Sequence, residues 1–298
     1  MLTGVNVLLL GGDARQLEIM NRLCESNATV SICGFEQKKE LHEKAVPIEL
    51  TKGAFAKLDA LLLPAVGCDD DGYVHTVFSS ESIQLSDELL AALPRACVVY
   101  TGVAKPYLRQ LCARHAIALV ELFERDDIAI YNSIPTMEGA LMMAIQHTDF
   151  TIHRSQSMVL GFGRTGISMA RGLQALGSTV WIGVRRSEHF ARAYEMGFQP
   201  FYIKDLEQIV ANIDLLFNTI PTMIITAQII DKLQKNAVII DLATKPGGTD
   251  FAYAESKGIK ALLAPGLPGI VAPKTAGLIL ADCLSQLLLE QKTNRRGI

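Results

Sequence analysis

The feature that most constrains this chain is a glycine-rich turn at residues 161–166, Gly-Phe-Gly-Arg-Thr-Gly. The short apolar segment Ser157–Leu160 precedes it, and Thr165–Leu176 carries small and apolar residues at helical spacing. In such a turn between a strand and a helix, the first glycine allows the tight bend, the second admits a pyrophosphate to the backbone, and the third lets the helix pack on the sheet. The helix N-terminus adds N–H groups and a positive dipole end for the phosphates. The pattern predicts a dinucleotide site made by Gly161, Gly163, Arg164, Thr165 and Gly166.

The next predicted strand indicates which dinucleotide is bound. Thr179–Val184 has the apolar character of a second strand and is followed at once by Arg185, Arg186 and Ser187. Enzymes that use NAD usually place an acidic residue about 20 residues after the glycine turn, to bind the ribose 2′-hydroxyl. Here the first carboxylate after the strand is that of Glu188. Two guanidinium groups and a hydroxyl suit a 2′-phosphate, so we expect NADP(H); ordinary solvated arginines are the alternative.

Strand-like and helix-like segments alternate along the chain in two series. In the first, we expect strands at residues 5–10, 29–33, 58–63, 97–100 and 116–120, with helices at about 14–25, 86–92 and 106–115. In the second, we expect strands at 157–160, 179–184, 198–202, 214–218, 237–241 and 260–263. Such alternation favours parallel sheets with helices on both faces. We therefore predict an α/β protein with two Rossmann-like, doubly wound parallel-sheet domains that face a cleft.

The expected connection between the two series lies at Asn132–Thr136, before a helical run to about His147. Pro135 fits near a helix start, because proline lacks an N–H and disfavours helix at the residue before it. We place an N-terminal, substrate-side domain at 1–134 and the NADP-binding domain at 135–274. The remaining segment, 275–298, is expected to form a helix that packs back toward the N-terminal domain.

Ligands of open α/β sheets bind outside the carboxyl ends of the strands. In the second series, Asn218, Thr219 and Pro221 follow the fourth expected strand. We expect these residues to line the nicotinamide ribose, with a turn that contacts no ligand as the alternative.

Composition excludes several other classes of protein. With 49% apolar and 20% charged residues, the chain can build a large core, and its net charge of −3 gives no electrostatic case for nucleic-acid binding. Apolar runs of membrane-spanning length are absent and no basic segment precedes residues 5–10, so we expect a soluble, cytoplasmic protein. The six cysteines are scattered without a Cys-x-x-Cys pair, which favours reduced structural thiols over disulfides or a metal site.

Several short blocks carry a resemblance to a known family. They are Gly11–Gln16, Phe123–Asp127, Asn132–Thr136 with Glu138-Gly139, Pro265–Gly269 and Ala272–Gly277. Taken together, these blocks resemble the A-subunit family of dipicolinate synthases from endospore-forming bacteria, over essentially the whole chain. The fold implied is similar to that of the bilobal dehydrogenases of the formate/glycerate type and of adenosylhomocysteinase.

The resemblance implies an NADP-dependent oxidoreductase that works with a flavoprotein, the B-subunit of the same synthase. The implied reaction is the oxidation of dihydrodipicolinate, formed from 4-hydroxytetrahydrodipicolinate of the lysine branch, to dipicolinate. It would take place in the mother-cell cytoplasm during sporulation. The expected partners are a cyclic dicarboxylate substrate, the flavoprotein and further copies of this chain in a homo-oligomer, but neither nucleic acid nor a membrane nor a metal ion.

A dicarboxylate substrate directs attention to cationic side chains near strand ends. Arg15 follows the first expected strand and is a candidate carboxylate ligand, because arginine binds carboxylates bidentately; an exposed arginine at a helix start is the alternative. Asp13 is equally a helix cap or a substrate contact. Arg125 either anchors a carboxylate or pairs with Asp126 or Glu124.

Three polar residues, Asn132, Ser133 and Thr136, lie beside the expected connection between the domains. They are candidates for contact with substrate or nicotinamide, with turn and capping chemistry as the alternative. Lys274 lies at the start of the last expected helix and is a candidate for carboxylate binding or proton transfer. The predicted substrate and catalytic residues are therefore Arg15, Ser133, Thr136 and Lys274.

Two other functions are compared with this one. A reductase of the 2-hydroxyacid dehydrogenase type needs an acid/base histidine after the late proline-rich segment, and Pro265–Gly277 contains none. A catalytically silent, nucleotide-binding protein that regulates the flavoprotein is compatible with the sequence.

Overall fold

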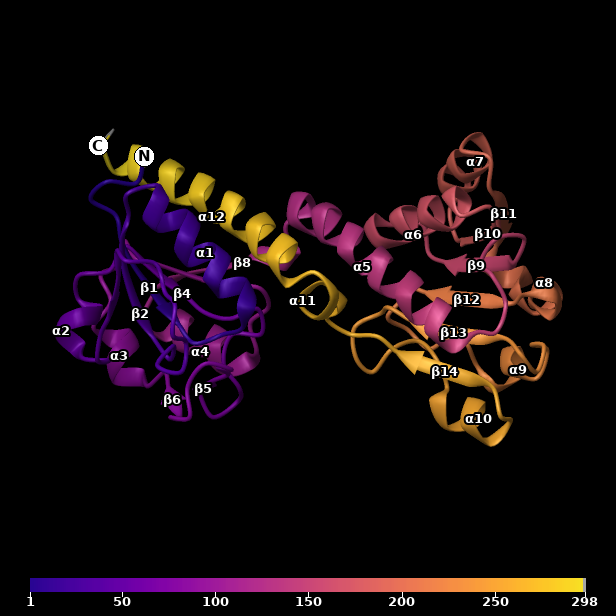
Figure 1. Cartoon of the computed structure of the whole chain (residues 1–298), viewed down its shortest axis with the longest axis horizontal. Helices are drawn as coiled ribbons and strands as arrows, with labels where there is room; N and C mark the ends of the chain where they lie inside the picture. The colour runs from indigo at the N-terminus through magenta and orange to yellow at the C-terminus, as the bar shows by residue number, and fades with distance from the viewer. Residues whose placement is uncertain (297–298) are drawn as a thin grey trace. The chain divides into compact units, whose positions relative to one another are not determined.

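The computed structural model describes residues 1–296 and divides into two compact units (Figure 1). Unit 1 comprises Met1–Ala129 together with the chain from Ala272 onward, and unit 2 comprises Ile130–Val271. The domain limits predicted after residues 134 and 274 fall inside the helices α5 (Asp126–His147) and α12 (Pro273–Arg296).

Unit 1 contains a parallel sheet of six strands in the order β3-β2-β1-β4-β7-β8. The strands are β1 (Asn6–Leu10), β2 (Thr29–Cys33), β3 (Ala45–Pro47), β4 (Ala60–Leu62), β7 (Val98–Thr101) and β8 (Ala118–Glu121). Besides α12, its helices are α1 (Ala14–Glu25), α2 (Lys52–Phe55), α3 (Asp87–Ala91) and α4 (Pro106–Arg114). A separate antiparallel pair is formed by β5 (Tyr73–Val74) and β6 (Ile83–Gln84).

Alternate side chains of β1 build two cores, because successive residues of a strand point to opposite faces of the sheet. Val7 and Leu9 belong to the cluster that includes residues of α1 and α12. Leu8 and Leu10 belong to the cluster that includes residues of α3 and α4. After Asn6 the strand is therefore apolar, as expected for a parallel sheet covered on both faces.

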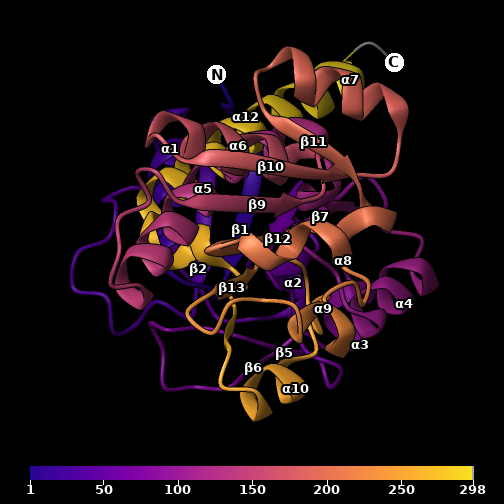
Figure 2. The same ribbon diagram turned by 90° about the vertical axis from the view of Figure 1, so that its right-hand side faces the viewer.

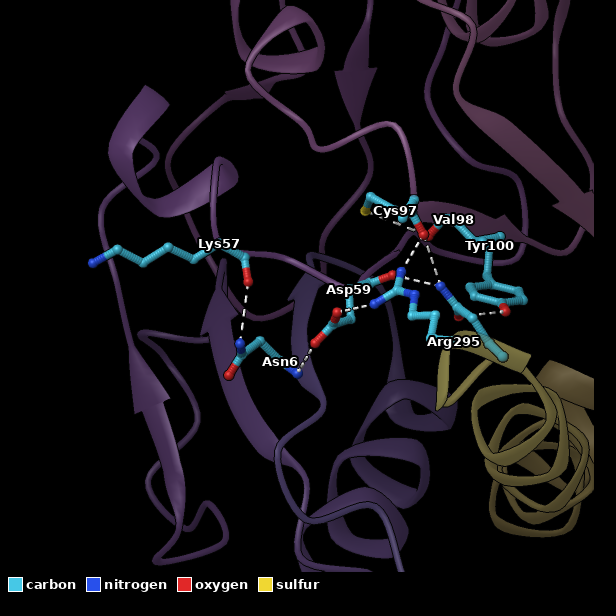
Figure 3. Close-up of polar contacts among 9 residues, drawn as sticks. Asn6, Lys57, Asp59, Cys97, Val98, Tyr100 and Arg295 are labelled. Carbon is cyan, nitrogen blue, oxygen red and sulfur yellow. Dashed lines mark hydrogen bonds and ion pairs between the residues drawn. The ribbon is translucent and has the colours of Figure 1, made fainter. Parts of the chain in front are cut away.

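The last helix, α12, is part of unit 1 and is held at two places. Near its start it approaches α1 closely: a Cβ at Gly277 would lie 2.7 Å from the Arg15 carbonyl oxygen. Near its end, the Gln291 side-chain amide donates to the carbonyl oxygens of Asp59 (3.1 Å) and Ala96 (3.0 Å). Arg295 adds contacts to the Asp59 carboxylate and the Ala96 carbonyl (Figure 3). Helix α12 begins at Pro273, two residues before the predicted segment 275–298, the last two residues of which lie outside the described range.

Unit 2 repeats the same strand order with different strands, β11-β10-β9-β12-β13-β14, all parallel. They are β9 (Gln156–Leu160), β10 (Thr179–Val184), β11 (Gln199–Tyr202), β12 (Leu215–Asn218), β13 (Val238–Asp241) and β14 (Lys260–Leu263). Figure 2 shows β10, β9 and β12 side by side. The helices are α6 (Arg164–Ala175), α7 (Ser187–Glu195), α8 (Leu206–Ile209), α9 (Ala227–Ile230), α10 (Phe251–Ser256) and α11 (Leu267–Val271), with most of α5. The predicted α/β class with two parallel sheets is confirmed.

The prediction that a helix starts near Pro135, after a connecting segment at Asn132–Thr136, is wrong. Helix α5 begins at Asp126 and runs through Pro135. Proline removes one backbone hydrogen bond from a helix interior, but the packing of α5 offsets this loss. Pro135 is buried, and small residues bring α5 close to its neighbours within unit 2: a Cβ at Gly139 would lie 3.1 Å from Leu267, and one at Gly172 would contact Met137. Tertiary contacts therefore outweigh the local preference of the proline.

Candidate cofactor and substrate sites

The predicted dinucleotide turn lies between β9 and α6, and its three glycines differ in surroundings. Gly161 has φ +98°, a conformation that favours glycine, and a Cβ there would meet the Thr219 hydroxyl. A Cβ at Gly166 would meet the Gly161 carbonyl oxygen, so α6 can pack on the strand end only with glycine here. A Cβ at Gly163 would meet no atom within 4 Å. Gly163 therefore leaves its backbone open to a ligand.

The N-terminus of α6 attracts anions. Its N-cap residue is Gly163, which has no side chain to cap the helix, and the first turn contains no acidic residue. N–H groups without a side-chain cap and the positive end of the helix dipole favour the binding of a phosphate at such a position. Arg164 and Thr165 are the first two residues of this helix.

A pocket of about 470 Å³ lies beside the glycine turn, at the carboxyl ends of β9 and β10. Its lining includes Gly161, Phe162, Arg185, Arg186, His189 and Ile220. The side chain of Arg185 is exposed, and the Arg186 guanidinium lies 3.3 Å from the Glu188 carboxylate in an exposed ion pair. Ser187 begins α7 directly after the two arginines. The structure thus gathers the arginines predicted for the 2′-phosphate at a pocket that adjoins the glycine turn.

Sequence reasoning missed His189, a half-buried residue in the same pocket. Its ring packs edge-on against Phe162, with 6.2 Å between ring centroids. His189 lies three residues after Arg186 on α7, and helical residues three apart share a face. This spacing from Arg186 could have indicated that His189 faces the same pocket.

Asn218 is fully buried and holds the backbone, so its amide is already used within the protein. Its Oδ1 accepts from the Ile220 N–H, and its Nδ2 donates to the Ile220 carbonyl and to Asp241 Oδ1, each at 3.0 Å. Asp241, also fully buried, accepts in addition from the N–H groups of Ala243 and Gly248 and from the Thr249 hydroxyl, at 2.6–3.0 Å. The pair fixes the loops after β12 and β13. Asn218 therefore shapes the rim of the site, and Asp241, which sequence reasoning missed, does the same.

Thr219 and Pro221 complete the loop after β12. The Thr219 hydroxyl donates to the Leu160 carbonyl oxygen at 2.8 Å, which ties this loop to the end of β9. Pro221 is exposed at the same rim. Both residues lie on the edge of the sheet that carries the glycine turn, because all six strands are parallel.

In unit 1, the turn between β1 and α1 carries the Asp13 and Arg15 side chains. Asp13 is the N-cap of α1 and accepts from the Arg15 N–H at 3.0 Å, so the capping alternative is confirmed. The same carboxylate binds the Arg15 guanidinium through Nε (3.0 Å) and Nη2 (2.6 Å). Burial alone would raise the pKa of Asp13, but the hydrogen bonds and charge of Arg15 outweigh it and lower the pKa below its usual value. Arg15 is therefore an oriented cation, with 15% of its side chain exposed.

The polar residues of α5 bond within their own helix. Thr136 Oγ1 donates to the Asn132 carbonyl at 2.7 Å, and the Ser133 hydroxyl donates to the Ile130 carbonyl at 2.6 Å. Ser133 also lies 2.6 Å from the Ser168 hydroxyl of α6. These bonds secure α5 and its contact with α6; the predicted roles of Ser133 and Thr136 toward a substrate remain predictions.

Lys274 and Arg125 lie in unit 1. Lys274 is the second residue of α12 and has an exposed side chain. The Arg125 guanidinium pairs with Asp127, at 3.0 Å through Nε and 2.8 Å through Nη2. Arg125 thus forms an ion pair, one of its two predicted alternatives, with Asp127 as a partner that the sequence analysis had not named.

All six cysteines are free in this structure. Burial raises the pKa of Cys97 to about 12 and that of Cys68 and Cys112 to about 11. Within residues 1–296, no helix has both the length and the apolar character that crossing a membrane requires. The same residues contain no group of three or more His, Cys, Asp or Glu side chains suited to a metal ion.

Two comparisons define the class of protein. Residues 129–296 match the family model "Alanine dehydrogenase/PNT, C-terminal domain". The fold also resembles the crystal structure of transhydrogenase from Sinorhizobium meliloti, with a TM-score of 0.67 at 14% identity over 95% of this chain and 93% of the other. Together with the glycine turn, they identify a dehydrogenase-like protein with a nucleotide-binding domain.

Further comparisons give the particular family. Residues 6–123 match the family model for the N-terminal domain of the dipicolinate synthase A-subunit. The chain is 51% identical to the A-subunit of dipicolinate synthase from Bacillus subtilis, over 97% of its own length and 98% of the relative. It also matches the crystal structure of the same protein from Bacillus halodurans, with a TM-score of 0.94 at 51% identity over 97% of this chain and 99% of the other. This chain belongs to the A-subunit family of dipicolinate synthases.

Proposed function

We propose that this chain is the NADP-dependent oxidoreductase component of a dipicolinate synthase, which converts dihydrodipicolinate, formed from 4-hydroxytetrahydrodipicolinate, to dipicolinate. The observation that carries the cofactor assignment is the pocket beside the glycine turn, where Arg185 and Arg186 stand in the place of an acidic residue. A carboxylate there would repel a 2′-phosphate, whereas guanidinium groups bind one.

The residues of unit 2 suit this cofactor. The open backbone at Gly163 and the N-terminus of α6 would hold the pyrophosphate, and Arg185, Arg186 and Ser187 would hold the 2′-phosphate. Asn218 and Asp241 keep the loops of the rim in place. When bound, NADP⁺ supplies the hydride acceptor that the oxidation of a dihydropyridine ring requires.

The residues of unit 1 suit a carboxylate. The Nε and Nη2 groups of the Arg15 guanidinium donate to the Asp13 carboxylate. A substrate carboxylate would accept from the remaining N–H donors of this guanidinium. Such a contact orients the ring before reaction and so lowers the entropic part of the barrier. Ser133, Thr136 and Lys274 are proposed as further substrate-site residues.

Membership in an A-subunit family also implies a second component, the B-subunit. We propose that this partner is a flavoprotein and that the pair works in the mother-cell cytoplasm of a sporulating bacterium, with this chain as a homo-oligomer. Neither nucleic acid nor membrane nor metal is part of this proposal.

The test is a reconstitution. The purified chain, with and without the partner flavoprotein, is mixed with enzymatically generated 4-hydroxytetrahydrodipicolinate and either NADP⁺ or NAD⁺, and dipicolinate is followed by its ultraviolet absorption. We expect formation of dipicolinate with concurrent NADPH formation, faster with NADP⁺ than with NAD⁺. Dipicolinate formation that needs the flavoprotein but no nicotinamide cofactor would assign this chain a regulatory role instead.

A further inference from the structure

Gln16 has an unusual environment for a polar side chain. It is 3% exposed, and neither its Nε2 nor its Oε1 has a hydrogen-bond partner within the protein. A buried amide that leaves water without a new partner costs stability. Most buried polar groups of native proteins are paired, so an unpaired one calls for an explanation.

The position of Gln16 in the fold matches that of a functional glycine in unit 2. Gln16 is the third residue of α1 after the N-cap Asp13, as Gly166 is the third residue of α6 after the N-cap Gly163. In unit 2 the helix at this position packs directly on the end of the strand, because a Cβ at Gly166 would meet the Gly161 carbonyl oxygen. In unit 1 the corresponding place holds a long side chain. The amide therefore lies at the carboxyl end of β1, where α/β sheets bind ligands.

A small cavity adjoins the amide. It has a volume of about 10 Å³ and is lined by Gln16 together with Asp13, Arg15 and apolar residues such as Leu62, Leu280 and Leu284. This volume holds one group of the size of a water molecule. Arg15, which we propose as the carboxylate ligand, therefore borders the same cavity as Gln16. The side chains of Asp13 and Arg15 are also partly exposed to solvent.

The chemistry of the amide restricts what fills the cavity. A primary amide offers both N–H donors and a carbonyl acceptor, and here both ends are unpaired. A water molecule or a hydroxyl group has this size and both accepts and donates, and of the groups on a hydroxylated cyclic dicarboxylate only the hydroxyl does both. A carboxylate oxygen or a pyridine nitrogen only accepts, so either would leave the Gln16 carbonyl unpaired.

We propose that Gln16 binds a hydroxyl group of the substrate while Arg15 binds a carboxylate of the same molecule. This inference rests on the proposed function and deepens it: the chain first binds the hydroxylated tetrahydro ring, whose hydroxyl donates and accepts, and that ring loses its hydroxyl as water to give the dihydrodipicolinate that is then oxidised. The product, an aromatic dicarboxylate, has acceptors only and satisfies the amide in part. Gln16 thus favours binding of substrate over product.

The test compares Gln16→Met with wild type in the full chain, assayed with the partner flavoprotein. Methionine keeps the unbranched shape and removes the unpaired amide, so we expect an unchanged or higher melting temperature. We also expect kcat/KM for 4-hydroxytetrahydrodipicolinate to fall at least tenfold, and the Kd of dipicolinate to change less than threefold. Ser285→Ala is the matched control: it removes another buried unpaired oxygen of unit 1, from a residue that is not among those lining the cavity, and should leave both quantities unchanged.

The outcomes separate this inference from the proposed function. If Gln16→Met melts higher and retains full kcat/KM, the cavity holds an ordered water only and the inference is overturned, while the proposed function stands. If the wild type forms no dipicolinate, the proposed function fails. The inference is then tested by the rise in melting temperature on adding 4-hydroxytetrahydrodipicolinate. We expect this rise in wild type and not in Gln16→Met. An equal rise in both proteins overturns the inference.

Discussion

The loop after the first strand of each unit joins a five-residue strand to a twelve-residue helix, β1 to α1 in unit 1 and β9 to α6 in unit 2. The N-cap is Asp13 in unit 1 and Gly163 in unit 2. In unit 1 the carboxylate occupies the helix N-terminus and binds Arg15, whereas in unit 2 the same place has no side chain. Two units with one strand order thus differ in charge at the point where a ligand meets the helix.

This difference shows how one fold can serve two kinds of ligand. A helix N-terminus without a side-chain cap favours a phosphate. A helix N-terminus that is capped by a carboxylate binds phosphate poorly. At α1 the capping carboxylate of Asp13 instead orients the cationic side chain of Arg15. We therefore propose that unit 2 binds the dinucleotide and unit 1 the carboxylate substrate, and two of the substitutions below each test one side of that proposal.

The largest effect on cofactor binding is expected from exchanging the N-cap residues. Gly163→Asp places a carboxylate where we propose that the pyrophosphate approaches. Because Gly163 has an extended backbone and nothing near its Cβ, the variant should fold. Like charges brought together cost several kcal/mol, so NADPH affinity should fall at least about 100-fold, roughly 3 kcal/mol, in calorimetric titrations. The reverse change, Asp13→Gly, should leave NADPH affinity unaltered; a Gly163→Asp chain that still binds NADPH normally would remove the glycine turn from the site.

Arg15→Ala tests the substrate side. Loss of a charge-assisted pair leaves the substrate carboxylate unpaired, at a cost of about 2–5 kcal/mol. We expect KM for substrate to rise steeply or activity to vanish, with NADPH affinity nearly unchanged. The matched control is Arg22→Ala on the same helix, where the guanidinium forms an exposed ion pair with Asp282. Steady-state kinetics equal to those of wild type would exclude Arg15 from the substrate site.

A smaller effect is expected from Gln291→Ala, which addresses a feature of unit 1 alone. The Gln291 amide joins α12 to the backbone of Asp59 and Ala96, and its loss leaves two carbonyl oxygens without this donor, at a cost of about 1–2 kcal/mol. The melting temperature should fall, while NADPH affinity at unit 2 should not change. Gln286→Ala, which removes only an exposed contact with Glu290, should melt as wild type does. Equal melting of both variants would show that the Gln291 contacts contribute no stability.

The sequence predicted much of the fold because most strands are continuous apolar runs between glycine-containing turns. α1 and β2 have the predicted limits, as does β10. The short elements β3 and α2 were not predicted, since three or four residues carry no measurable periodicity.

The candidate site was predicted less completely than the fold. The glycine turn and the two arginines are local signals, because each directly follows a strand that the sequence predicts, β9 and β10. Contacts between distant segments carry no such signal. The hydrogen bond of Asn218 to Asp241 and the unpaired amide of Gln16 depend on the packing of whole elements. Ser133 was placed in a connecting segment before a helix, because the packing that keeps α5 helical through Pro135 is tertiary.

The central claim, an NADP(H) site in unit 2, is tested most directly by calorimetric titration of NADPH and NADH against wild type and Arg185→Asp. Arg192→Asp is the control, because Arg192 lies on α7 in an exposed pair with Glu195. We expect wild type and the control to bind NADPH more tightly than NADH. Arg185→Asp should weaken NADPH binding by about 1.5–3 kcal/mol, the range for a hydrogen bond to a charged group, and affect NADH little. Equal affinities of NADPH and NADH for the wild-type chain would contradict the account.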